Sequence, residues 1–211
     1  MKIRKTIGGI ILFLILIFLA LLLLDRGGFL SRASLSARES FEKASETLEN
    51  QGRKAVLTKI STGGVSVVWN RSISEQEVEG RGDRWRLCFY SEKEDKFIYF
   101  ENTTRERLEE KEEWAYHMCV GNKNEINIEK WKIDSEKAVE IAKNKAKELG
   151  KEEFIIVSIG LSQKEENRPI WRIELLPQYV GGKTTGLIVT IDAETEKVIK
   201  AQETTRFFKE M

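Results

Sequence analysis

The segments DRWRLCFY, beginning at residue 83, and PIWRIELL, beginning at residue 169, each contain tryptophan, arginine and an aliphatic residue in a row, 86 positions apart. Side chains alternate between the two faces of a β-strand, so Trp85 and Trp171 would each lie on the covered face of a strand. Burying an indole removes about 150–250 Å² from water, and we therefore expect these two residues to anchor hydrophobic cores. The recurrence predicts two copies of one small module.

The arginine that follows each tryptophan would point to the other face of its strand, toward solvent or a partner. We therefore expect Arg86 and Arg172 at a partner surface, together with the exposed edges of the sheet, which can accept an added strand. In the alternative interpretation the two arginines only keep the sheet soluble.

A helix is expected before the first tryptophan strand. Residues 36–52 carry apolar side chains at steps of three and four, the spacing of one helix face: Ala37, Phe41, Ala44 and Leu48. Ser36 and Glu39 form a capping-box pattern at its start, and Gly52 supplies the stop.

A second helix, over residues 134–150, repeats the first about 99 positions later. Its apolar positions are Ala138, Val139, Ala142, Ala146 and Leu149. Asp134 or Ser135 caps its start, and Gly150 ends it. A short strand is expected after each helix, AVLTKI at residues 55–60 and FIIVSI at residues 154–159. Further on, residues 96–108 and 186–199 each read as a strand, a polar turn and a last short segment.

The repeated order predicts an α+β fold in which an N-terminal transmembrane helix is followed by two tandem helix-plus-antiparallel-sheet modules. We divide the chain into a cytoplasmic tail (1–5), a transmembrane anchor (6–25), a linker (26–34), a first module (35–120), a second module (121–205) and a C-terminal tail (206–211). Whether the two modules form one continuous sheet is left open by the sequence.

The membrane anchor is the run Ile7–Leu24, which contains no charged side chain. As a helix it would span roughly 27 Å, close to the ~30 Å hydrocarbon core. The run is longer than the core of a cleaved signal peptide, and no Ala-x-Ala site follows it, which favours an uncleaved anchor. Three cations, Lys2, Arg4 and Lys5, precede it and place the N-terminus in the cytoplasm. We expect a single-pass cell membrane protein whose soluble part is extracytoplasmic.

The charge balance and the absence of catalytic motifs exclude several classes of function. Lysine and arginine (35) nearly cancel aspartate and glutamate (34), and no basic stripe occurs, so we expect no nucleic-acid partner. No nucleophile elbow, phosphate loop, dinucleotide fingerprint or His-Glu-x-x-His stretch occurs, and we expect no enzyme activity. His117, the only histidine, adjoins Met118 and Cys119, but no second cluster would complete a metal shell. We expect no metal and no cofactor.

Cys88 and Cys119 are the only cysteines. If they meet in an oxidising compartment, a disulfide would contribute roughly 3 to 4 kcal/mol in the chain-entropy model. Two separate buried thiols are the alternative, because spacing alone does not show that the residues meet. Asn70 and Asn102 stand in glycosylation sequons that we expect to be accessible. The charged run 105–118 fits either a helix or the last strand of the first module.

The second half of the chain resembles a PepSY domain. The likeness lies in WKIDSEKAVEIAKNKAKELG (131–150), PIWRIEL (169–175) and IVTIDAETEKVI (188–199). The resemblance implies a helix-plus-antiparallel-sheet module that binds or restrains a peptidase, and it brings no catalytic residues. One position departs from the pattern, because Glu196 stands where the family's Asp-x-x-Thr-Gly turn has glycine. A left-handed conformation there would cost about 1 kcal/mol.

Together these observations predict a membrane-anchored extracytoplasmic binding or regulatory protein that restrains or recruits a peptidase through PepSY-like modules. One alternative is a structural envelope protein that self-associates and has no peptidase partner. A thiol-dependent enzyme using Cys119 and His117 is a third class, which the missing motifs disfavour.

Overall fold

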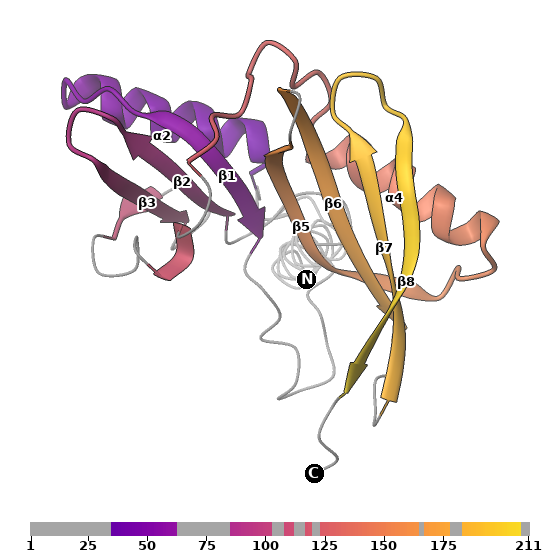
Figure 1. Ribbon diagram of the computed structural model, residues 1–211. Coiled ribbons are helices and arrows are strands. Elements are labelled where there is room, and N and C mark those ends of the chain that lie inside the picture. The colour runs from indigo at the N-terminus through magenta and orange to yellow at the C-terminus, as the bar shows by residue number, and fades with distance from the viewer. Residues whose placement is uncertain are drawn as a thin grey trace, which may run out of the picture. The chain divides into compact units, whose positions relative to one another are not determined.

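The computed structural model describes residues 35–62, 85–102, 108–111, 117–119, 123–164, 167–177 and 183–207. Residues Ser34–Met211 form one compact unit. The described elements follow the order helix then four strands, twice (Figure 1): α2 (Ala37–Asn50), β1 (Val56–Thr62), β2 (Trp85–Ser91), β3 (Lys96–Asn102), β4 (Leu108–Glu110), α4 (Ser135–Glu148), β5 (Phe154–Lys164), β6 (Arg168–Pro177), β7 (Lys183–Asp192) and β8 (Val198–Phe207). The run 105–118 thus contains strand β4.

The eight strands form a single antiparallel sheet in the order β4-β3-β2-β1-β5-β6-β7-β8. The predicted fold class, two tandem helix-plus-sheet modules, is therefore wrong. The first strand of each half supplies the joint, because β1 pairs with β5. Each of these strands has β2 or β6 on one side and would otherwise expose unpaired backbone groups on the other. Pairing them satisfies both edges at once.

The joint between β1 and β5 is symmetric. Ser61 pairs with Gly160, and these two residues are equivalent in the repeat of 99 positions. A bulge at Thr58 shifts the pairing of β1 with β2, and one at Val157 shifts that of β5 with β6 at the equivalent place. The halves are thus related as two copies around an approximate two-fold axis at Ser61 and Gly160.

Both helices have the ends that the sequence predicts. Ser36 and Glu39 form the capping box of α2, while the Asp134 side chain accepts from the Ser135 N–H at the start of α4. Gly52 and Gly150 follow the two helices with φ values of 67° and 68°, a left-handed conformation that glycine adopts without strain.

The core lies between the helices and one face of the sheet. Trp85 and Trp171 are fully buried there. Trp85 donates from Nε1 to the Leu35 carbonyl at 2.7 Å, and Trp171 donates from Nε1 to the Ile133 carbonyl at 3.0 Å; Leu35 and Ile133 each directly precede the N-cap of a helix. Each indole therefore buries its rings while its only polar group is satisfied. The aromatic packing includes Trp131, whose ring centroid lies 6.0 Å from that of Trp171.

The N-terminal ends of the two helices contact each other through hydrogen bonds. The Arg38 N–H donates to Asp134 Oδ1 at 3.1 Å, and the Ala37 N–H donates to Ser135 Oγ at 3.1 Å. The Arg38 guanidinium also lies 4.4 Å from the centre of the Trp131 ring. Residues of the second half thus satisfy free N–H groups at the start of α2.

The β7–β8 turn is opened by Asp192, as the sequence predicts. Its Oδ1 accepts from the N–H groups of Glu194 and Thr195, both at 2.9 Å. Burial raises the pKa of the Asp192 carboxyl, but these N–H groups outweigh burial and hold the pKa below its ordinary value. Glu196 has a φ of 65°, so its backbone adopts the left-handed conformation although it is not glycine.

No helix among the described residues is long and apolar enough to cross a membrane. The predicted anchor and linker lie in residues 1–34, outside the described residues.

Candidate functional site

The face of the sheet that points away from α2 and α4 carries most of the predicted site residues, and we call it the back face. Alternation and pairing register assign the following residues to it: Ser61, Arg86, Cys88, Tyr99, Glu101, Gly160, Arg172, Glu174, Thr190, Lys200 and Arg206. Within the described residues, its two halves differ in chemistry.

A disulfide covers the back face in the first half. Cys88 on β2 and Cys119 are bonded, with their Cα atoms 5.6 Å apart. Both residues are buried, and they form a small cluster with Tyr99 that Phe97 and Met118 flank. Of the two alternatives that the sequence left open, the structure has the disulfide. The bond holds residues 117–119 against β2 and β3.

Arg86 is engaged in an ion-pair cluster next to the disulfide. Its Nε lies 3.1 Å from Glu101 Oε1, and Lys111 Nζ lies 3.3 Å from Glu101 Oε2. Burial raises the pKa of the Glu101 carboxyl, but the two cations outweigh burial and hold it below its ordinary value. Burial, followed by the negative charge of Glu101, raises the pKa of Tyr99 to about 12. Arg86 is therefore largely committed to its own sheet.

Arg172 occupies the equivalent position in the second half but is exposed. Its neighbours across the sheet are Gly160 on β5 and Thr190 on β7. No described residue forms an ion pair with it. Three strand spacings separate it from Arg86, or about 14 Å. The two predicted partner-surface arginines thus share a face, but only Arg172 has its charge free among the described residues.

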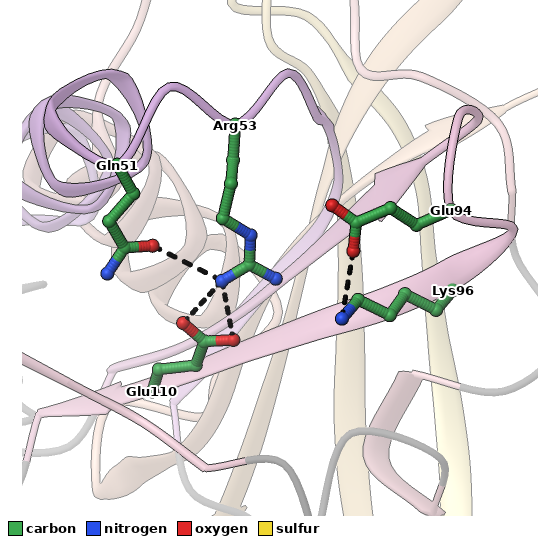
Figure 2. A network of polar contacts seen from close by, with 5 residues as sticks. All are labelled: Gln51, Arg53, Glu94, Lys96 and Glu110. Atoms are coloured by element: carbon green, nitrogen blue, oxygen red, sulfur yellow. Dashed lines mark hydrogen bonds and ion pairs between the residues drawn. The ribbon is translucent and has the colours of Figure 1, made fainter.

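The edge at β4 is short and clamped. The Arg53 Nη1 atom lies 2.8 Å and 2.7 Å from the two carboxylate oxygens of Glu110, and it also donates to Gln51 Oε1 (Figure 2). Glu94 and Lys96 form a second pair nearby, at 2.8 Å. The clamp ties β4 to the segment between α2 and β1. A short edge held by charged side chains is a poor template for an added strand.

The edge at β8 is different, because β8 is 10 residues long and pairs only with β7 among the described strands. It contains no proline. Its charged residues stand at every third position, namely Lys200, Glu203 and Arg206. Glu203 Oε1 lies 2.9 Å from Lys151 Nζ, while no described residue forms an ion pair with Lys200. The strand therefore offers a row of backbone N–H and C=O groups to a further strand.

Arg206 links this edge to a buried carboxylate on the back face. Its Nη2 donates to Oε2 of Glu174, a residue that is 5% exposed. The other carboxylate oxygen, Oε1, is buried and has no hydrogen-bond partner among the described residues. The Arg206 side chain remains 42% exposed. The ion pair thus ties the C-terminal part of β8 to β6 through side chains, across β7, with which β8 makes its backbone pairing.

The remaining predicted positions are placed as follows. Asn102 is 1% exposed and donates to Ser40 Oγ at 3.3 Å, so the expectation that it is accessible for glycosylation is wrong. Asn70 lies outside the described residues. His117 is exposed. Among the described residues, no group of three or more His, Cys, Asp or Glu side chains could hold a metal ion.

Comparisons with known proteins give little further guidance. No protein-family model matches the chain, and no curated protein matches it significantly. One solved structure, described as "a putative lipoprotein (CD1622) from Clostridium difficile 630", matches with a TM-score of 0.47 and 10% sequence identity, over 78% of this chain and 92% of that chain. At this score and identity the similarity supports no argument about function. The PepSY resemblance therefore has no family match behind it and stays a prediction.

Proposed function

We propose that this chain is a binding protein of the cell envelope that takes up an extended segment of a partner protein as a ninth strand beside β8. The observation that carries this proposal is the contrast between the two edges of the sheet. One edge is a strand of three residues clamped by Arg53 and Glu110, and the other is a strand of 10 residues without proline. In strand addition the backbone hydrogen bonds supply affinity and the flanking side chains supply specificity.

A place outside the cytoplasm is part of the proposal. It is supported by the disulfide between Cys88 and Cys119, because such bonds persist mainly in oxidising compartments. The apolar segment Ile7–Leu24 would hold the protein at the membrane. A peptidase is the partner class that the PepSY resemblance implies, and restraint or recruitment of such an enzyme fits a surface that binds extended chain.

The test is a pull-down with the full chain from detergent-solubilised membranes, comparing wild type with two proline variants. Successive residues of a strand point their N–H groups to opposite sides, so one of Thr204→Pro and Thr205→Pro removes a bond to β7 and the other removes only an outward N–H. Circular dichroism identifies the variant that keeps the fold. That variant should lose the partner.

Retention of every enriched partner by the folded proline variant would refute strand addition at β8. The same edge could instead pair with a second copy of the chain, the structural alternative. Light scattering distinguishes the two, since a closed oligomer that forms without any other protein, and that the folded proline variant abolishes, would favour self-association.

A further inference from the structure

The charges on β8 have a regular pattern that specifies the chemistry of a strand beside it. Lys200 and Arg206 lie on the back face and Glu203 on the helix side, so the edge reads base, two residues, acid, two residues, base. In an antiparallel pair, residues directly opposite share a face, and opposite charges there attract while like charges repel.

We propose, on the basis of the proposed strand addition at β8, that the partner segment carries the complementary pattern of an acidic residue, two residues, a basic residue, two residues and a second acidic residue. The two acids would face Lys200 and Arg206, and the base would face Glu203. Antiparallel pairing is expected because every strand pair in the sheet is antiparallel.

Lys200 is the strongest element of this pattern. It is exposed, and no described residue neutralises it, whereas Arg206 and Glu203 each have a partner within the chain. On β7, the residue opposite Lys200 on the same face is Thr190. The exposed Arg172 lies opposite Thr190 on the next strand, β6. An acid opposite Lys200 would therefore meet a cation that no described residue pairs with, while Arg172, three strand spacings or about 14 Å away, would contribute little. A second copy of this chain would present β8 with the same base-acid-base order, so that its own β8 does not supply the complement.

The test measures binding of three fluorescent peptides to the full chain in detergent by anisotropy, at about 0.15 M salt, where exposed charges interact over only about 8 Å. The peptide TEVTKVTEVT has the proposed pattern, TKVTEVTKVT has it reversed, and TQVTQVTQVT is neutral. We expect the first to bind about tenfold more tightly than the second, with the neutral peptide between them.

The variant Lys200→Glu should lower this preference by about three- to tenfold, because it places an acid opposite the acid of the peptide. The matched control is Lys197→Glu, which changes the net charge equally but lies before the strand begins and should leave the preference unchanged. An equal effect of both variants would show that net charge, and not the pairing position, governs binding, and would overturn the inference.

Equal binding of all three peptides would also overturn the charge pattern while leaving strand addition intact. Absence of binding by every peptide up to about 1 mM would overturn both proposals together. A dimer of the chain that excludes all three peptides would assign the edge to a second copy and would likewise overturn the inference.

Discussion

Removal of the disulfide between Cys88 and Cys119 should strongly destabilise the compact unit Ser34–Met211. The bond closes a sequence separation of 31 residues. In the chain-entropy model, losing such a loop constraint from the unfolded state costs about 3.7 kcal/mol at 25 °C. Alanine is the appropriate replacement, because serine would add a polar group to a cluster in which both cysteines are buried beside Tyr99.

The assay is urea unfolding of residues 34–211, followed by tryptophan fluorescence. With an m-value of about 2 kcal/mol/M, the double variant Cys88→Ala/Cys119→Ala should unfold at a midpoint roughly 2 M lower than the oxidised wild type. Wild type treated with a reductant should behave as the double variant does, because both lack the cross-link.

The two single variants provide the internal control. Each single variant removes the disulfide as completely as the double variant does. Each should therefore lose nearly all of the unfolding free energy that the disulfide contributes, and the double-mutant cycle should show a large coupling energy. Coincident unfolding of oxidised wild type and double variant would refute the reasoning. The reasoning would also be refuted if each single variant lost little stability and the two losses simply added, since that would indicate two independent buried side chains.

Four further predictions follow from individual positions. A methyl group at Gly186 would lie 2.5 Å and 2.9 Å from atoms of β6, so Gly186→Ala should cost about 1–3 kcal/mol in urea unfolding, whereas Gly160→Ala, whose nearest contact is 3.6 Å, should cost little. Asp192→Asn should be less stable than wild type at neutral pH. Because the pKa of Asp192 is lowered in the folded state, this difference should be full above its ordinary value of 3.8 and should vanish as the pH falls through the lowered value. Glu196→Gly should raise stability by up to about 1 kcal/mol, since it relieves a left-handed conformation. Asn102→Gln should leave electrophoretic mobility unchanged in a glycosylating host, because the side chain is buried.

Local features of the fold were predictable because their causes are local. The capping box at Ser36 and the terminating glycines Gly52 and Gly150 are encoded within a few residues of the helix ends, and the structure confirms all of them. The burial of Trp85 and Trp171 also follows from strand alternation and side-chain size.

The joining of the two halves into one sheet could not be predicted from local sequence. Pairing of β1 with β5 depends on two segments about 100 positions apart whose apolar patterns fit equally well in separate sheets. The burial of Asn102 was missed for a related reason. A sequon in a turn indicates exposure, and only the packing of α2 on β3 brings Ser40 over the amide.

At the candidate site, the sequence predicted that Arg86 and Arg172 both lie on the face opposite the tryptophans. It could not show that Arg86 is ion-paired within the sheet while Arg172 is not paired with any described residue. The difference arises from Glu101 on β3, which pairs with Arg86, while the position facing Arg172 on β7 is Thr190. The alignment of the two repeats predicts that Arg86 and Arg172 are equivalent, and it does not take account of a different residue in the neighbouring strand. The charge spacing on β8 was visible in the sequence, but it acquired meaning only when β8 proved to be the outermost strand.

The symmetric seam between β1 and β5 has the geometry of a homodimer interface enclosed in one polypeptide. Two free copies of a half-length ancestor would join along the same strands, and gene fusion would make their association independent of protein concentration. In a fused chain the two halves need not be identical. Cys88 and Glu174 occupy equivalent places in the repeat, yet Cys88 cross-links a neighbouring segment and Glu174 holds β8, the outermost of the described strands, so one position of the repeat serves two separate purposes.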